Sequence, residues 1–100
     1  MFSVDTVEFA KAIADETRQQ IMRLCCCRQL SVSEIVKQMG VTQPTVSHHL
    51  RILRDVELVK AERRGKEIYY TLNQEKMAQS CCQVADHFAP DVELQISSKS

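Results

Sequence analysis

The chain has 100 residues, of which 44% are hydrophobic and 26% are charged, as expected for one globular domain. A multi-domain enzyme is excluded, because a chain this short buries only about two thirds of its unfolded surface. Thirteen Lys and Arg balance thirteen Asp and Glu, whereas a simple nucleic-acid binder carries a positive excess. No apolar run reaches the ~20 residues of a membrane span, and the N-terminus lacks signal-peptide features, which favours a cytoplasmic protein.

The first quarter of the chain predicts two helices. Apolar side chains recur at helical spacing over residues 4–14. This face comprises Val4, Val7, Ala10, Ile13 and Ala14. Asp15 is a suitable N-cap for a second helix, in which Ile21, Leu24 and Cys25 are expected to be buried.

The next segment predicts a helix-turn-helix. Ser31 and Glu34 have the spacing of a capping box, which would open a short third helix with Ile35, Val36 and Met39 facing inward. Gly40 suits the left-handed residue that often ends a helix. A fourth helix is expected to begin near Thr42, with Pro44 in its first turn. Its apolar row is Val46, Leu50 and Leu53.

Two strand patterns, residues 58–62 and 67–72, predict a β-hairpin whose turn contains Arg63, Arg64, Gly65 and Lys66. A last helix is expected from about Asn73 to Phe88, because Pro90 stops it. The fold class is therefore mainly α with a small β-hairpin wing. The predicted organisation is a winged helix-turn-helix domain over residues 1–90, followed by a flexible tail over residues 91–100.

The outward face of the fourth helix carries residues suited to DNA. In a helix-turn-helix the second helix enters the major groove, where side chains near its start reach base edges. Gln pairs with adenine and Arg with guanine, while Ser and Thr suit phosphates. The candidate DNA-binding residues are Gln43, Thr45, Ser47, His48 and Arg51 on this helix, with Arg63, Arg64 and Lys66 at the hairpin tip. The alternative is that this face of the fourth helix is exposed to solvent and does not bind DNA. His49 is expected to be a half-buried residue with a packing role.

Four segments together resemble the ArsR/SmtB family of bacterial repressors. They are Ala14–Arg18, Leu30–Ile35, Gln43–Arg54 and the wing end Ile68–Leu72. The resemblance covers roughly residues 5–88. It implies a homodimer, formed through the first and last helices, that binds double-stranded operator DNA and releases it when an inducer binds.

Two further features bear on this resemblance. Met77, Cys81, Val84 and Phe88 form an apolar stripe on the last helix, which is the face that such an interface needs. Glu57 stands where the family usually has Gly after the recognition helix. A left-handed Glu57 would cost about 1 kcal/mol.

The positions of the family's usual inducer sites lack the expected ligands. The arsenite site, a Cys-x-Cys at the start of the third helix, corresponds here to Ser31 and Ser33. The zinc site on the last helix corresponds to Gln74, Lys76, His87 and Pro90. A lone His cannot form a four-coordinate zinc site, so zinc or nickel sensing there is disfavoured.

The cysteine thiols remain as candidates for the inducer site. The cysteines are Cys25, Cys26 and Cys27 at the end of the second helix, and Cys81 and Cys82 on the last helix. Thiolates select soft ions, so the leading hypothesis is a tri-thiolate inducer site for As(III), Sb(III) or another thiophilic ion, with no obligate cofactor. It would form within the first cluster or at the second pair with an added ligand.

Three alternatives remain open. A thiol-redox or sulfide switch would join the two helices, because adjacent cysteines are too close for an ordinary disulfide. Packing is a further role for Cys25 and Cys81. A winged helix used only as a protein-interaction module is a distant third. An enzyme is disfavoured, since the sequence offers no orienting group for a nucleophilic cysteine.

The neutral total charge conceals an uneven distribution. Residues 41–72 hold six basic and four acidic side chains, a net charge of +2, and the remainder of the chain has −2. The neutral total charge is therefore no argument against DNA binding. A modestly basic half predicts moderate, salt-sensitive affinity for DNA.

Overall fold

A computed structural model of the chain describes residues 4–91, and the side chains from Thr6 onward. Over this range it contains five helices and three short strands. In chain order these are α1 (Val4–Ile13), α2 (Glu16–Leu24), β1 (Leu30–Ser31), α3 (Val32–Met39), α4 (Gln43–Asp55), β2 (Val59–Arg64), β3 (Glu67–Leu72) and α5 (Gln74–Phe88). The predicted fold class is confirmed. Of the predicted tail, residues 92–100 lie outside the described residues.

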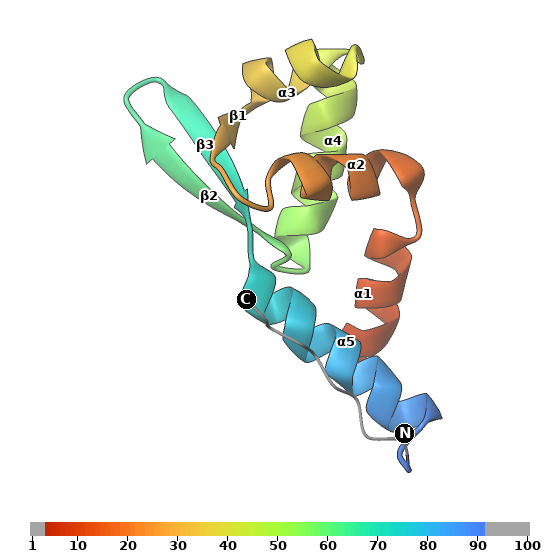
Figure 1. Cartoon of the computed structure of the whole chain (residues 1–100). Coiled ribbons are helices and arrows are strands. Elements are labelled where there is room, and N and C mark those ends of the chain that lie inside the picture. Colours follow the sequence, from red (N-terminus) through yellow and green to blue (C-terminus); the bar gives the residue numbers. More distant parts are fainter. Residues whose placement is uncertain (1–3, 92–100) are drawn as a thin grey trace.

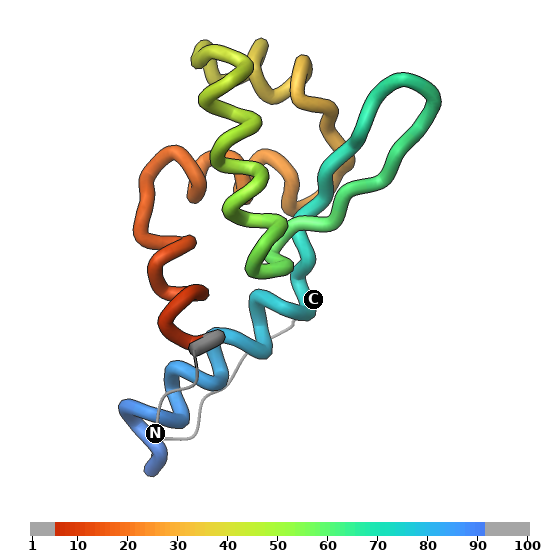
Figure 2. The backbone as a smooth tube through the Cα atoms, turned by 180° about the vertical axis from the view of Figure 1, so that it is seen from behind, coloured from red at the N-terminus to blue at the C-terminus, as the bar shows by residue number. Residues whose placement is uncertain are grey.

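The wing and the terminal helices lie at opposite ends of the molecule (Figure 1). The hairpin β2–β3 projects beside α3 and α4, whereas α1 and α5 lie side by side at the other end, as the view from behind also shows (Figure 2). None of the described helices is long and apolar enough to cross a membrane. The arrangement separates a surface built on α4 and the wing from one built on α1 and α5.

Local signals set the helix boundaries as the sequence predicts. The Asp15 carboxylate accepts a hydrogen bond from Arg18 N at 3.0 Å and caps α2. Ser31 Oγ accepts from Glu34 N at 3.2 Å, while Ser31 N donates to Glu34 Oε1 at 2.9 Å, so the capping box is complete. Gly40 ends α3 with φ 73°, a left-handed conformation that costs Gly nothing.

The core lies between α2, α3, α4 and the sheet. Its fully buried side chains are Ile21, Cys25, Ile35, Val46, Leu50, Leu53 and Leu58. These include the predicted apolar row of α4. Leu24 is only half-buried and packs at the edge of this core.

The face of α1 that packs against the core differs from the apolar face identified from the sequence. Thr6, Phe9 and Ala12 are buried, whereas Val7 is 41% exposed and Ala10 is exposed. Burying the aromatic ring of Phe9 removes more apolar area from water than burying valine or alanine does, so this face turns toward the core. Of the apolar face identified from the sequence, Val7, Ala10 and Ala14 therefore remain exposed, whereas Ile13 is half-buried against the core.

The sheet has three antiparallel strands in the order β1-β3-β2. Strand β1 was not predicted, because its two residues are too short for an alternating pattern and overlap the capping box. Strand β2 is longer than predicted and continues through Arg64, which pairs with Glu67. The turn therefore consists only of Gly65 and Lys66, with Gly65 at φ 64°.

The expected strain at Glu57 is present. Its φ is 64°, the left-handed value that the resemblance associated with a glycine. Its backbone is held at both ends, since Glu57 N donates to Arg54 O at 2.9 Å and Asn73 Nδ2 donates to Glu57 O at 3.0 Å. These bonds fix the passage from α4 into β2.

Candidate nucleic-acid interface and cysteine cluster

An open groove joins the start of α4 to the wing. Its volume is about 360 Å³. The groove is lined by Ser31, Val32, Ser33, Gln43, Ser47, Lys66, Glu67, Ile68 and Tyr70. Candidates from two distant parts of the sequence, Gln43 and Ser47 on α4 and Lys66 on the turn, thus meet on one surface.

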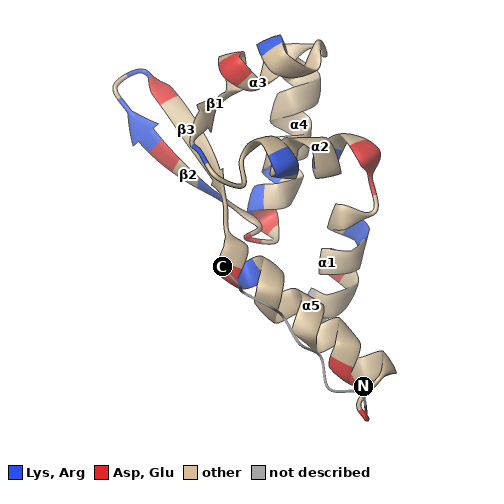
Figure 3. Cartoon of the chain, in the orientation of Figure 1, with Lys and Arg blue, Asp and Glu red and all other residues tan. Residues whose placement is uncertain are grey.

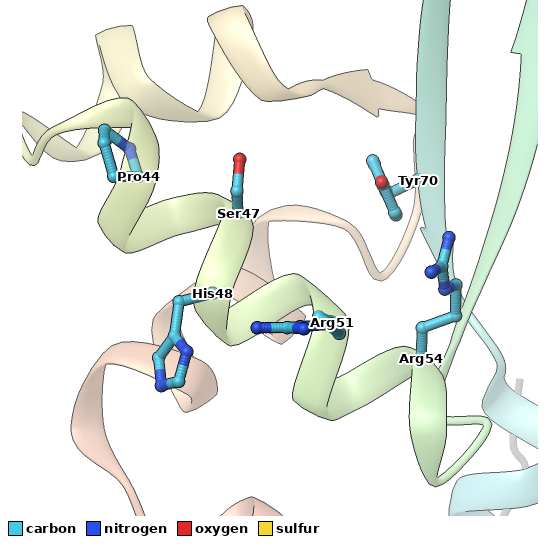
Figure 4. A pocket seen from close by; sticks show the side chains of 6 residues that line it. All are labelled: Pro44, Ser47, His48, Arg51, Arg54 and Tyr70. Atoms are coloured by element: carbon cyan, nitrogen blue, oxygen red, sulfur yellow. The ribbon is translucent and has the colours of Figure 1, made fainter.

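A second groove of about 380 Å³ continues along α4 (Figure 4). It is lined by Pro44, Ser47, His48, Arg51, Arg54 and Tyr70. Ser47, His48 and Arg51 are exposed, and Ser47 and His48 leave the helix on opposite sides in Figure 4. The row of polar and basic side chains along α4 gives the helix the donors that base edges and phosphates require.

Thr45 is less accessible than its neighbours on α4. Its side chain is half-buried, and its hydroxyl shares a hydrogen bond of 2.9 Å with the Thr42 hydroxyl. Thr42 is the N-cap of α4 but makes no side-chain hydrogen bond to the helix backbone. The first turn of α4 therefore keeps unpaired N–H groups that suit a phosphate.

The two arginines of the wing point to opposite faces of the sheet. Arg63 pairs with Ile68, and Arg64 pairs with Glu67 in the adjacent register position. Successive side chains of a strand alternate between faces, so Arg63 shares the face of Ile68 and Tyr70, both of which line the groove beside α4. Both arginines lie next to the turn but not within it, because β2 continues through them to its last pair, Arg64 with Glu67.

Arg64 is held on the other face by three neighbours. Its guanidinium lies 5.2 Å from the Tyr69 ring centre, 3.6 Å from a Glu62 carboxylate oxygen, and donates to Gln29 Oε1. Gln29 Nε2 in turn donates to Glu62 Oε1 at 2.9 Å. Acidic residues accompany the basic ones along the wing strands (Figure 3). Arg64 thus ties the wing to the segment between α2 and β1.

His49 is half-buried, as predicted, and belongs to a structural network. Arg18 donates through Nη1 to His49 Nδ1 at 3.0 Å, through Nε to Ala12 O at 2.6 Å, and through Nη2 to Lys11 O at 3.2 Å. A guanidinium cannot accept, so His49 Nδ1 is the acceptor and the ring is neutral. Burial lowers the pKa of His49 despite the Asp15 carboxylate 3.9 Å away. This network joins α1 and α2 to α4.

The three cysteines after α2 have different environments. Cys25 is fully buried in the core, and burial raises the pKa of its thiol to about 11. Cys26 is half-buried and Cys27 is exposed, and their Sγ atoms are 3.2 Å apart. The hydrogen bond with Cys27 raises the pKa of Cys26. Cys25 is therefore part of the packed core, whereas Cys26 and Cys27 are a neighbouring pair outside it.

The cysteines of α5 face differently. Cys81 is exposed and lies 4.0 Å from the Met77 sulfur, and Cys82 is half-buried. Among the side chains that the structure describes, no group of three His, Cys, Asp or Glu is arranged to hold a metal ion. The candidate cysteines thus do not gather into a three-ligand site within one protomer.

Three residues of this region were missed from the sequence. Arg54 and Tyr70 line the second groove, and Gln29 links Arg64 to Glu62. The inward position of Tyr70 was accessible from strand alternation. The role of Gln29 had no sequence signal, because it depends on a contact across 35 positions.

Fold and surface together define a winged helix-turn-helix DNA-binding protein. A family model described as "Bacterial regulatory protein, arsR family" matches residues 15–61. The chain belongs to the ArsR family. This family consists of DNA-binding transcriptional regulators, not enzymes, which confirms the resemblance and the class predicted from the sequence.

Individual relatives agree with this assignment. The chain is 39% identical to the transcriptional repressor SmtB homolog of Synechocystis sp., over 80% of this chain and 61% of that one. It is 38% identical to the transcriptional repressor SdpR of Bacillus subtilis, over 63% and 70% of the two chains. It is 40% identical to the arsenical resistance operon repressor of Bacillus subtilis, over 67% and 65%. The chain thus spans slightly less than two thirds of some of these relatives.

A solved structure shows the same architecture. It is the homodimeric winged helix-turn-helix DNA-binding domain Mb0332 from Mycobacterium bovis. The two are 25% identical, the match covers 91% of this chain and 88% of that one, and the TM-score is 0.70.

Proposed function

We propose that the protein is a homodimeric operator-binding repressor that releases DNA when a thiophilic inducer binds at its cysteines. The observation that carries the DNA-binding part is the continuous surface formed by α4 and the groove side of the wing. The start of α4 would enter the major groove, with Gln43, Ser47, His48 and Arg51 toward the bases. Thr45 would support the first turn, and Arg63 and Lys66 would contact phosphates.

The two wing arginines give a matched test of this surface. Arg63→Ala removes a cation on the groove side, whereas Arg64→Ala removes one that Glu62, Gln29 and Tyr69 already engage. We expect Arg63→Ala to weaken binding uniformly across operator sequences and to reduce the salt slope of log Kd by about 1. Arg64→Ala should change the slope less. Equal slopes for both variants and wild type, measured by fluorescence anisotropy, would contradict this use of the wing and favour a protein-interaction module.

The dimer would form through α1 and α5. Apolar side chains remain exposed there, with Val7 at 41% and Phe88 at 70%. A shallow hollow of about 420 Å³ lies between the two helices, lined by Phe9, Ala10, Ile13, Ala14, Gln19, Cys81 and Val84. Large exposed apolar patches mark interaction sites, and Mb0332 of Mycobacterium bovis, which has this fold, is a homodimer.

A charge placed in this face tests the dimer. Val84→Asp would put a carboxylate into the apolar hollow, and we expect monomers in sedimentation velocity. Glu75→Gln, a change near the start of the same helix and outside that hollow, is the control and should leave the dimer intact. A dimeric Val84→Asp variant would place the interface elsewhere.

The inducer would be As(III), Sb(III) or a related thiophilic ion held by the cysteines after α2. Two observations support this: the thiols of Cys26 and Cys27 are adjacent and accessible, and a relative of this chain is an arsenical resistance operon repressor. Cys81 and Cys82 are the second candidate pair. A thiol-redox or sulfide switch is the alternative.

Operator release under two conditions separates these chemistries. Arsenite in the presence of a phosphine reductant should release DNA, and single Cys→Ser variants would show which thiols act. Peroxide or persulfide in metal-free buffer should have no effect. Release only in the second condition would replace the metalloid inducer by the redox switch.

A further inference from the structure

We infer that Cys26 and Cys27 form a two-thiol site for a monosubstituted trivalent arsenical, in which arsenic keeps one carbon substituent and exchanges two oxygen ligands. This inference rests on the proposed function and names the ligand class of its inducer site. It differs from the tri-thiolate site that the sequence suggested, because the structure supplies two neighbouring sulfurs there and not three.

The sulfur geometry fits a single bridging atom. The Sγ atoms of Cys26 and Cys27 are 3.2 Å apart. With bonds of about 2.3 Å, the length that thiolates make to zinc, one atom spans this separation at an angle close to a right angle. That angle suits a pyramidal three-coordinate centre. The pair therefore needs little rearrangement to chelate one arsenic atom.

The third coordination position has no protein ligand. Cys25 is fully buried among core side chains, and bringing its sulfur to the surface would leave a cavity in the core. Its thiol also stays protonated at neutral pH, because burial raises its pKa to about 11. Among the described side chains no third His, Cys, Asp or Glu completes a site. A ligand that brings its own third substituent matches this arrangement.

The chemistry balances without an oxidant. Two As–O bonds of a dihydroxy arsenical break and two As–S bonds form. Each thiol proton leaves with one hydroxide as water, and arsenic stays trivalent. The product is a neutral dithioarsenite ring.

The turn that carries the pair is hydrogen-bonded to the wing and to the start of α5. Gln74 Nε2 donates to Cys26 O at 2.6 Å, and Leu72 N donates to Cys25 O at 3.0 Å. Two residues after Cys27, Gln29 accepts from Arg64 and donates to Glu62 on the wing. A ring closed over Cys26 and Cys27 would restrain this turn and so act on the wing and on the start of α5.

Phenylarsine oxide is the probe, with a phosphine reductant and native mass spectrometry as the readout. We expect one adduct per protomer on the wild type. Cys26→Ser and Cys27→Ser should each weaken binding by about 100-fold or more, because the second bond is no longer intramolecular. Cys81→Ser and Cys82→Ser distinguish this site from the second candidate pair, and both variants should keep the adduct. Differential alkylation should show protection of the first pair.

Each of the other possible results would overturn a specific part of the proposed site or of its function. An adduct that survives in the Cys26→Ser/Cys27→Ser double variant would overturn the site and leave operator binding untouched. Arsenite that binds as tightly as the probe, and that binds more weakly to a Cys25→Ser variant, would show a three-thiol site instead. A wild-type adduct on the pair without any loss of operator affinity would keep the site but refute the proposed inducer function. Gln29→Ala should bind the probe normally and release DNA less.

Discussion

Replacing Glu57 with glycine should stabilise the protein. Glu57 has φ 64°, a conformation that costs a residue with a Cβ about 1–2 kcal/mol and glycine nothing. Both hydrogen bonds at this position use backbone atoms of Glu57, with Arg54 O and Asn73 Nδ2 as partners. The substitution therefore removes strain and leaves these contacts in place.

The net gain is smaller than the strain removed. Glycine also gives the unfolded chain more conformational freedom, which costs about 0.4–1 kcal/mol. The difference lies between about 0 and 1.6 kcal/mol, with a central value of about 0.8 kcal/mol in the free energy of unfolding. For a domain of this size the central value corresponds to a rise of about 3–6 °C in Tm.

Chemical and thermal denaturation followed by circular dichroism would measure this gain, at one fixed protein concentration because a dimer's stability depends on it. Asp55→Gly is the matched control, since Asp55 lies in the last turn of α4 and glycine there should lower stability by up to about 1 kcal/mol. Glu57→Asn should fall between glycine and wild type, because Asn tolerates this conformation better than Glu. A Glu57→Gly variant less stable than wild type would refute the reasoning.

Three further predictions follow from individual contacts. Ser31→Ala should lower the free energy of unfolding by about 1 kcal/mol, measured in urea, because Glu34 N loses its acceptor; an unchanged midpoint would show that the capping box contributes nothing. Burial lowers the pKa of His49 below its ordinary value of 6.5, so on acidification the unfolded chain takes up the proton before the folded chain does. The stability that is present above pH 6.5 should therefore fall as the pH drops below this value. An NMR titration that gives His49 a pKa above 6.5 would reverse the sign of this prediction. Arg51→Ala should cost about 1–3 kcal/mol of operator affinity and relax preference at one base pair; a uniform loss across operator variants would make Arg51 a phosphate contact.

The predicted elements follow from local interactions. The N-cap Asp15, the capping box of Ser31 and Glu34, and the left-handed Gly40 each act within a few residues, so the sequence contains the whole interaction. The apolar row of α4 was equally readable, because one face of a single helix is buried. The buried face of α1 could not be read from the sequence, since two faces carry apolar residues and only packing against α2 and α5 selects between them.

The candidate site depended more on tertiary structure. The exposed row on α4 was predicted from the helix-turn-helix, but its groove with Lys66 and Tyr70 required the position of the wing. Arg63 and Arg64 are neighbours in sequence with different environments, because β2 runs through both and places them on opposite faces. The cysteine cluster likewise divides, with Cys25 in the core.

The sequence by itself determined the class of protein, through helix caps, apolar periodicity and family segments that each depend on short stretches of chain. It also located the thiols and the polar face of α4. The tertiary structure decided which of these side chains can act together. Burial of Cys25 and strand alternation at Arg63 and Arg64 arise from contacts between distant segments, and the free energy of such contacts has no counterpart in local sequence.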